Sequence, residues 1–469
     1  ALGNKAALGT GTLTFNTNSN TTLRAEGIDL TGADTIANAW INNNPNDNNT
    51  ITLGGRRDFG GTFDMQLSGT GTIIAPTAAQ NHFFSVEDTQ VTATLSGAIG
   101  GGSDNLIFGK TGIGTLVLSG NNTFDVRDTA LVGGSILTLG TPEGIRIDGG
   151  VLRVAHSNAL GTGDATFTNV NLRGDLGAVL EIDGAAGAVN ITNKHIVLFH
   201  PDNSTARGLL NRSSNEAVHT GTLRNIAGTN SINGQIDIRN IANNANNGTA
   251  FIGSDAGNLN LSGQIIGSRN ETNTTVTNNR FLYKTGAGAV ELSGGAANTI
   301  NGGYFVMNGE LRLNKTAGVN AIDGNIIVGD NVGGANADRL VFVQSNQVAD
   351  ARTLTVNSSG QIHFNTGVSD TFSGTIALFA GETSSANINF SGAGSTLNND
   401  VSVTYRPGVV SSTGATITGD FGLGATRTFT VNDGPSTNDL TISGIVSGAG
   451  GLTKSGAGQL AVTNNNSYA

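Results

Sequence analysis

Residues 106–120 read Leu-Ile-Phe-Gly-Lys-Thr-Gly-Ile-Gly-Thr-Leu-Val-Leu-Ser-Gly. The second half of this stretch, from Thr115 to Ser119, alternates its side chains with a period of two, which is typical of a β-strand. The two glycines before it, Gly112 and Gly114, permit positive φ angles at a turn. The stretch therefore predicts a turn followed by a strand whose alternate residues point into a core.

The same motif recurs twice further along the chain. One copy begins at Phe281 and reads FLYKTGAGAVELSG, and another begins at Leu452 and reads LTKSGAGQLAVT. The shared frame is Lys-[Thr/Ser]-Gly-x-Gly-x-[Leu/Val]-x-[Leu/Val], and its lysines at 110, 284 and 454 lie 174 and 170 residues apart. We assign a structural role in the repeat to the lysine and the two glycines of each copy, which are Lys110, Gly112, Gly114, Lys284, Gly286, Gly288, Lys454, Gly456 and Gly458.

A second landmark repeats in the same phase as the lysine motif. Ala-Leu-Gly-Thr-Gly begins at Ala7 and again at Ala159, and a degenerate copy begins at Ala321. The two landmarks together predict one continuous β-helix of about three long, degenerate units, with approximate bounds 1–157, 158–319 and 320–469.

The rest of the chain has the same strand-like texture from end to end. Short runs such as Leu354–Asn357 and Thr428–Asn432 alternate apolar and polar residues and are bounded by Gly, Asn or Ser. No window carries a sustained helical stripe, and the 70 glycines would weaken helices wherever they fell. Uniform strands without a linker are typical of a solenoid. The fold class that we predict is all-β, an elongated parallel β-helix.

Composition excludes several classes of function. The chain has no Cys, so disulfides, thiolate catalysis and Cys-based metal sites are ruled out. Its net charge of -10 and 24 dispersed Lys and Arg residues lack the basic footprint of a nucleic-acid-binding protein. The chain contains no stretch of 18 or more apolar residues, so the sequence predicts no transmembrane helix. The chain begins at Ala1 without a signal-peptide pattern, which we interpret as a processed or excised piece.

The repeat resembles a known family, the passenger-associated transport repeat, also called the autotransporter-associated β-strand repeat. That family's pattern is Gly-x-Gly-Thr-Leu-x-Leu-Ser-Gly-x-Asn-Thr-Tyr, followed by Gly-Gly-Thr and Gly-x-Leu. Residues 112–124 match it closely, 286–300 match with an insertion, and 456–468 match up to the end of the chain. Asp125–Asp128 departs from the expected Gly-Gly-Thr. The resemblance implies a right-handed parallel β-helix that a Gram-negative bacterium exports and displays on its surface.

Few residues suggest chemistry. Alternation places His195 and His200 on opposite faces of a strand, so they do not form a metal pair, and 100–106 is only a single near miss to a calcium-binding nonapeptide. Arg173, Gly174 and Asp175 spell an integrin-binding tripeptide, for which adhesion is the functional interpretation and a turn between strands the alternative. We expect no enzymatic activity, no metal and no cofactor.

The sequence leaves three functions open. The first is an extracellular, non-catalytic stalk or adhesin on the bacterial outer surface, in contact with a host, a neighbouring cell or a polysaccharide. The second is a subunit of a filament or surface layer that self-associates through its end coils by β-strand addition. The third is a polysaccharide-active β-helix enzyme, which a carboxylate-lined groove would favour.

Overall fold

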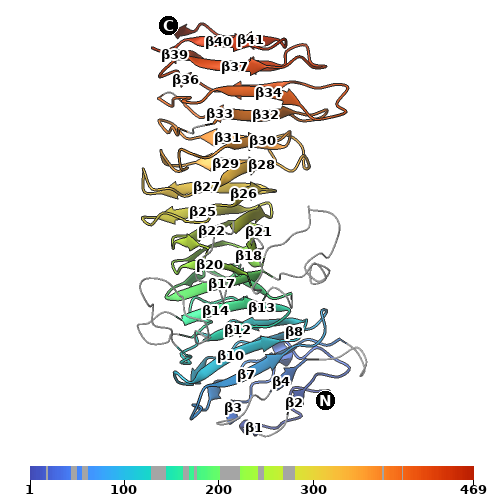
Figure 1. Ribbon diagram of the computed structural model, residues 1–469. Helices are drawn as coiled ribbons and strands as arrows, with labels where there is room; N and C mark the ends of the chain where they lie inside the picture. Colours follow the sequence, from blue (N-terminus) through green and yellow to red (C-terminus); the bar gives the residue numbers. More distant parts are fainter. Residues whose placement is uncertain are drawn as a thin grey trace. The chain divides into compact units, whose positions relative to one another are not determined.

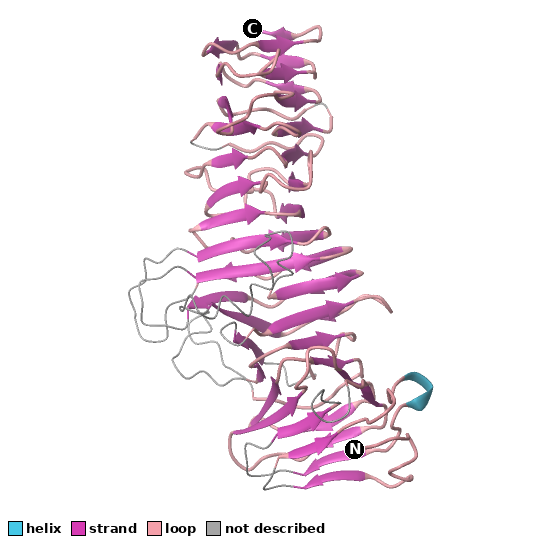
Figure 2. Cartoon of the chain, turned by 90° about the vertical axis from the view of Figure 1, so that its right-hand side faces the viewer, coloured by secondary structure: helices cyan, strands magenta, loops and turns pink. Residues whose placement is uncertain are grey.

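The computed structural model describes residues 1–16, 20–43, 50–54, 62–127, 144–161, 168–173, 177–200, 222–240, 248–267, 280–371, 374–392 and 394–469. These residues are all-β, as the sequence predicts, and the helical structure among them is one short 3-10 helix, η1 (Gly32–Asp34) (Figure 2). They fall into two compact units. The first contains the described residues up to 248 and the second contains those from 249 onward.

The first unit is built from parallel strands that return repeatedly to the same sheets (Figure 1). One sheet has the order β1 (Leu13–Asn16), β3 (Trp40–Asn43), β6 (Gly71–Ile73) and β9 (Ile99–Gly101). A second contains β2 (Thr21–Leu23), β4 (Thr50–Leu53), β7 (Gln80–Ser85), β10 (Leu106–Thr111), β12 (Ile145–Ile147), β14 (Thr168–Arg173), β17 (Lys194–His200) and β20 (Ile236–Asn240). A third contains β5 (Met65–Leu67), β8 (Thr92–Leu95), β11 (Thr115–Leu118), β13 (Val151–Val154), β15 (Val179–Asp183) and β18 (Leu223–Ala227), and β16 (Asn190–Ile191) pairs with β19 (Thr229–Ile232).

In the second unit, too, the strands return repeatedly to the same sheets. One contains β21 (Gly248–Ser254), β24 (Arg280–Thr285), β26 (Gly303–Val306), β28 (Asn325–Val328), β30 (Leu354–Val356), β32 (Ile376–Ala380), β34 (Val401–Tyr405), β37 (Arg427–Val431) and β40 (Leu452–Ser455). Another contains β22 (Asn258–Leu261), β25 (Ala289–Gly294), β27 (Gly309–Lys315), β29 (Asp338–Phe342), β31 (Gly360–Phe364), β33 (Asn387–Phe390), β35 (Ala415–Thr418), β38 (Leu440–Ile442) and β41 (Leu460–Val462). Shorter strands complete the unit: β23 (Ile265–Ile266), β36 (Phe421–Gly422), β39 (Val446–Gly448) and β42 (Ser467–Tyr468).

The pairing register gives the length of one coil, by which we mean the chain from one strand to the next strand of the same sheet. Leu282 pairs with Tyr304 and Tyr304 with Ile326, so each of these coils adds 22 residues. In the first unit, Val154 pairs with Ile182, 28 residues later. Each coil thus covers its predecessor with parallel strands, and longer corner segments are inserted without changing the pairing. The architecture is solenoid-like.

Inward-facing residues of successive coils form continuous apolar columns. In the strand that the opening motif predicts, Leu116 and Leu118 are fully buried, and they pair with Leu152 and Val154 of the next coil. Burying such side chains in register stabilises each coil only against its neighbours, as in other repeat proteins.

Stacked aromatic rings follow the core of each unit, which the sequence did not lead us to expect. The rings of neighbouring coils lie between 4.5 and 6.4 Å apart, close enough for favourable ring contacts. The column of the first unit consists of Phe15, Trp40, Phe84, Phe108 and Phe124, and that of the second unit consists of Phe342, Phe364, Phe390 and Phe421.

Candidate functional site

The lysine of the first motif copy lies in a cage of backbone carbonyl groups. Lys110 stands at the end of β10, and its side chain is fully buried. The Nζ atom donates hydrogen bonds to the carbonyl oxygens of Thr111 at 2.8 Å, Gly112 at 2.9 Å and Gly149 at 3.0 Å. Thr111 and Gly112 belong to its own turn, whereas Gly149 precedes β13 in the next coil. An ammonium group has three N–H donors, and all three are therefore used.

The second copy repeats this geometry. The Nζ atom of Lys284, also fully buried, donates to the carbonyl oxygens of Thr285 at 3.0 Å, Gly286 at 2.7 Å and Asn308 at 2.5 Å. Asn308 precedes β27 in the next coil, as Gly149 precedes β13 in the first copy. The motif lysine is therefore a link between coils.

Burial lowers the pKa of the Lys110 ammonium to about 7, because the charged form loses its hydration. Burial likewise lowers the pKa of Lys284 to about 7, although the carboxylates of Asp338 and Glu310 act in the opposite direction. The carbonyl cages offset part of this cost, since hydrogen bonds to a charged donor are stronger than those to a neutral one.

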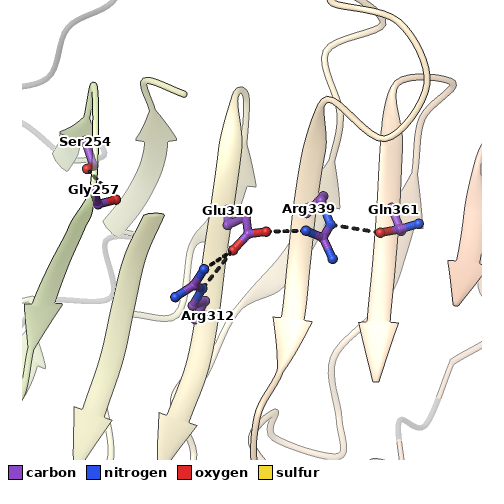
Figure 3. Close-up of polar contacts among 6 residues, drawn as sticks. All are labelled: Ser254, Gly257, Glu310, Arg312, Arg339 and Gln361. Atoms are coloured by element: carbon purple, nitrogen blue, oxygen red, sulfur yellow. Dashed lines mark hydrogen bonds and ion pairs between the residues drawn. The ribbon is translucent and has the colours of Figure 1, made fainter. Parts of the chain in front are cut away.

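The two glycines of each motif serve different purposes. The first has a positive φ in all three copies, 75° at Gly112, 76° at Gly286 and 81° at Gly456, so it forms the turn. The second is required for close packing. A Cβ at Gly114 would lie 2.3 Å from the Asp88 carbonyl oxygen, and one at Gly458 would lie 2.4 Å from that of Asn432. At Gly288 the neighbour is the buried Ser254 hydroxyl, which also reaches the Gly257 carbonyl oxygen at 3.4 Å (Figure 3).

In the first two copies, the coil that covers the motif begins with a further glycine. Gly150 and Gly309 have φ angles of 59° and 66° and lie directly on the motif turn. A Cβ at Gly309 would lie 2.5 Å from the carbonyl oxygens of both Gly286 and Gly288, and one at Gly150 would lie equally close to those of Gly112 and Gly114. Only glycine fits this position.

A buried asparagine that follows each of the first two motif copies also links three coils. The Asn122 side chain accepts a hydrogen bond from the Ile99 N–H at 2.9 Å and donates one to the Ala159 carbonyl at 2.7 Å. Asn298 accepts from the Ile265 N–H at 2.8 Å and donates to the Ala321 carbonyl at 2.8 Å. The alanine partners of these asparagines are marked in the sequence. Ala159 belongs to the Ala-Leu-Gly-Thr-Gly landmark, and Ala321 belongs to its degenerate copy.

The lysine and the asparagine of one copy therefore hold both ends of the same segment of the next coil. Lys110 and Asn122 hold Gly149 and Ala159, on either side of β13. Lys284 and Asn298 hold Asn308 and Ala321, on either side of β27. We call each of these two pairs a lysine–asparagine clamp.

The corresponding residues of the third copy, Lys454 and Asn466, differ from the two clamps. Lys454 is exposed, and its Nζ atom donates to the Gly456 carbonyl at 2.5 Å, the one carbonyl that the described residues offer it. Asn466 accepts from the Val446 N–H at 2.7 Å, as the other asparagines accept from the previous coil, but it donates to Asn464 of its own turn. The structure thus brings together the lysine and glycines predicted for each copy, but it completes only two of the three corners.

Polar side chains on β27 and the strands that follow it hydrogen-bond from coil to coil (Figure 3). Glu310 forms ion pairs with Arg312 and Arg339, and the Arg339 Nε donates to Gln361 at 2.8 Å. The row continues from Gln361 to Asn387 at 2.6 Å. These groups are largely occupied with one another, as in the amide ladders of stacked strands.

The other residues singled out in the sequence do not come together in a site within the described part of the chain. Gly174 and Asp175 lie outside the described residues, and Arg173 ends β14 with a side chain that is likewise outside them. His195 is buried, and its Nδ1 accepts a hydrogen bond from the Gln235 N–H at 3.0 Å. Over the described ranges, no group of three or more His, Asp or Glu side chains could hold a metal ion.

Within the described part of the chain, no helix is long and apolar enough to span a membrane. Comparison of the chain with protein-family models, with curated proteins and with solved structures gave no match.

Proposed function

We propose that this chain is a right-handed parallel β-helix that serves as an extracellular stalk or adhesin on a bacterial outer surface, without catalytic activity. The observation that carries the proposal is the use of the motif residues. The buried lysines and asparagines of the first two copies direct their hydrogen bonds to backbone groups of neighbouring coils. Residue types that serve catalysis in other proteins serve here to hold coils in register.

Two further features support display outside the cell. The chain has no Cys, which suits export through an oxidising compartment, and its repeat resembles that of autotransporter passengers.

Localisation on the producing bacterium tests the proposal. We expect an antibody against the purified chain to label intact cells as strongly as permeabilised cells, and brief protease treatment of intact cells to remove the signal. Latex beads coated with the chain should bind to cells or to immobilised polysaccharide more than beads coated with an unrelated acidic protein. Labelling that requires permeabilisation would contradict surface display. Beads that bind no better than the control would contradict the adhesin role and leave the stalk role standing.

A further inference from the structure

An Asn-Gly pair stands at the corner between β19 and β20 in the first unit. Asn233 is exposed, whereas Gly234 after it is buried. A Cβ at Gly234 would lie 1.7 Å from the carbonyl oxygen of Lys194, which belongs to the preceding strand of the same sheet as β20. The packing of one coil on the next therefore requires the glycine of this pair.

An asparagine followed by glycine has a reaction of its own, because glycine lacks the side chain that would hinder ring closure. The backbone nitrogen of the glycine attacks the asparagine Cγ and forms a new C–N bond. The Cγ–Nδ2 bond breaks, and the amide group leaves as ammonia with the proton that the backbone nitrogen gives up. Water then opens the five-membered succinimide ring at either carbonyl, which gives aspartate or isoaspartate. The overall change is hydrolysis of an amide, and water is its only co-reactant.

The fold arranges both reacting groups of Asn233 and Gly234 for this step. The Asn233 Oδ1 accepts a hydrogen bond from the Asn193 N–H of the preceding coil at 3.2 Å. Negative charge develops on this oxygen during the attack, so a backbone donor aimed at it stabilises the transition state, as in an oxyanion hole. The Gly234 N–H donates no hydrogen bond to any described residue. Its nitrogen is therefore available as the nucleophile.

Two further Asn-Gly pairs in the described part of the second unit are held differently. They are Asn301-Gly302 and Asn308-Gly309. The glycine N–H of the first donates to the Arg280 carbonyl oxygen, and that of the second donates to the Ala337 carbonyl oxygen, both at 3.0 Å. A nitrogen held in this way must lose its hydrogen bond before it can attack. The fold thus separates three pairs that have the same reacting groups.

We infer that Asn233 is a site of spontaneous deamidation, where the folded chain converts the asparagine to aspartate or isoaspartate while it protects the pairs at Asn301 and Asn308. Aspartate keeps an acceptor for the Asn193 N–H but adds a negative charge to the corner. Isoaspartate lengthens the main chain by one atom between β19 and β20, which loosens the corner. The modified fraction therefore rises with the age of the molecule.

Mass spectrometry of the purified chain tests the inference directly. The folded chain is incubated at pH 7.4 and 37 °C and digested with trypsin, and each deamidated residue is located by fragmentation. Trypsin releases Asn233 within residues 225–239 and the other two asparagines together within residues 285–312. We expect conversion at Asn233 to be at least about tenfold faster than at Asn301 or Asn308, since release of a protecting hydrogen bond costs about one power of ten in rate.

Two controls separate the fold from the local sequence. The same incubation in urea removes the hydrogen bonds of all three pairs, so their rates should become similar. Asn233→Gln lengthens the side chain by one methylene and requires a six-membered ring for closure. This variant should lose ammonia at position 233 much more slowly and leave the conversion at Asn301 unchanged.

Two results would overturn the inference. The first is conversion at Asn233 that is no faster than at Asn301 and Asn308 in the folded chain. The second is the same order of rates in urea, which would assign the difference to the neighbouring residues in the sequence rather than to the fold. Both results are distinguishable from failure of surface display, because both come from the purified chain.

Discussion

The Lys284 ammonium donates a 2.5 Å hydrogen bond to the backbone carbonyl of Asn308, which lies 24 residues later and one coil further along. This contact joins a motif turn to the coil that covers it. Because the carbonyl groups of Thr285 and Gly286 share the same ammonium, loss of the lysine leaves three acceptors without their donor.

Replacement of this lysine should be costly. Lys284→Met preserves the length of the side chain but removes the donor to three carbonyl groups, and we expect a loss of about 3 kcal/mol in the free energy of unfolding. The urea midpoint measures it. Lys454→Met is the matched control, because Lys454 is exposed and has one carbonyl partner, and it should change the free energy by less than about 0.5 kcal/mol. Equal effects of the two substitutions would contradict a special role for the cage.

The covering glycine gives a second prediction. Gly309→Ala introduces a Cβ both into a positive φ and against two carbonyl oxygens, whereas Gly318→Ala introduces one at a φ of 82° with no atom within 4 Å. We expect Gly318→Ala to cost about 1–2 kcal/mol from backbone strain alone and Gly309→Ala to cost clearly more. Thermal unfolding of the two variants compares them. A Gly309→Ala variant as stable as Gly318→Ala would show that the next coil does not pack on the turn.

The buried Asn298 gives a third prediction. Asn298→Ala removes the acceptor of the Ile265 N–H and the donor to the Ala321 carbonyl, at a cost of about 2 kcal/mol. Hydrogen exchange of the Ile265 amide should accelerate relative to amides at the centres of β25 and β27. Asn298→Asp retains an acceptor for Ile265, so it should protect that amide better than Asn298→Ala does. Unchanged exchange at Ile265 in both variants would contradict the clamp.

The buried lysines predict that stability rises with pH. The folded-state pKa of Lys110 and Lys284 is about 7, below the ordinary value of 10.5, because burial disfavours the charge. Between these values the unfolded chain binds more protons, so the free energy of unfolding increases with pH above about 7, by at most about 1.4 kcal/mol per pH unit for each lysine. Urea unfolding between pH 7 and 10 measures the slope, which Lys284→Met should reduce. A flat or falling profile would contradict the prediction.

A buried acid predicts the opposite trend at lower pH. Burial raises the pKa of Asp338 to about 6, and its carboxylate accepts a hydrogen bond from the Ser359 hydroxyl at 2.5 Å. Between about 3.8 and 6 the folded chain binds more protons, so Asp338 contributes stability that is lost as pH rises through 6. Asp338→Asn keeps an acceptor for Ser359 and should raise the free energy of unfolding at pH 7 by about 2 kcal/mol. Destabilisation at pH 7 would show that the carboxylate is needed in its charged form.

The sequence predicted the all-β class and the parallel repeat because alternation and the repeated glycine turn are local signals. Alternation within a single strand is enough to identify Leu116 and Leu118 as residues that face the core. The clamps could not be predicted in this way. Whether the Lys110 side chain is solvated or enclosed depends on Gly149, 39 residues later. No local sequence pattern shows which later segment will cover a given coil. The aromatic column from Phe15 to Phe124 could not be predicted for the same reason, since its members lie in different coils at irregular spacings along the chain.

One measurement tests both the fold and the proposed location. Intact cells that produce the chain are treated with a membrane-impermeant amine reagent, and the labelled lysines are identified by mass spectrometry. We predict that Lys5, whose side chain is 49% exposed, is labelled on intact cells, whereas Lys110 and Lys284 remain unlabelled until the chain is unfolded. Labelling of Lys5 only after lysis would contradict surface display, and labelling of Lys110 and Lys284 on intact cells would contradict the enclosed corners.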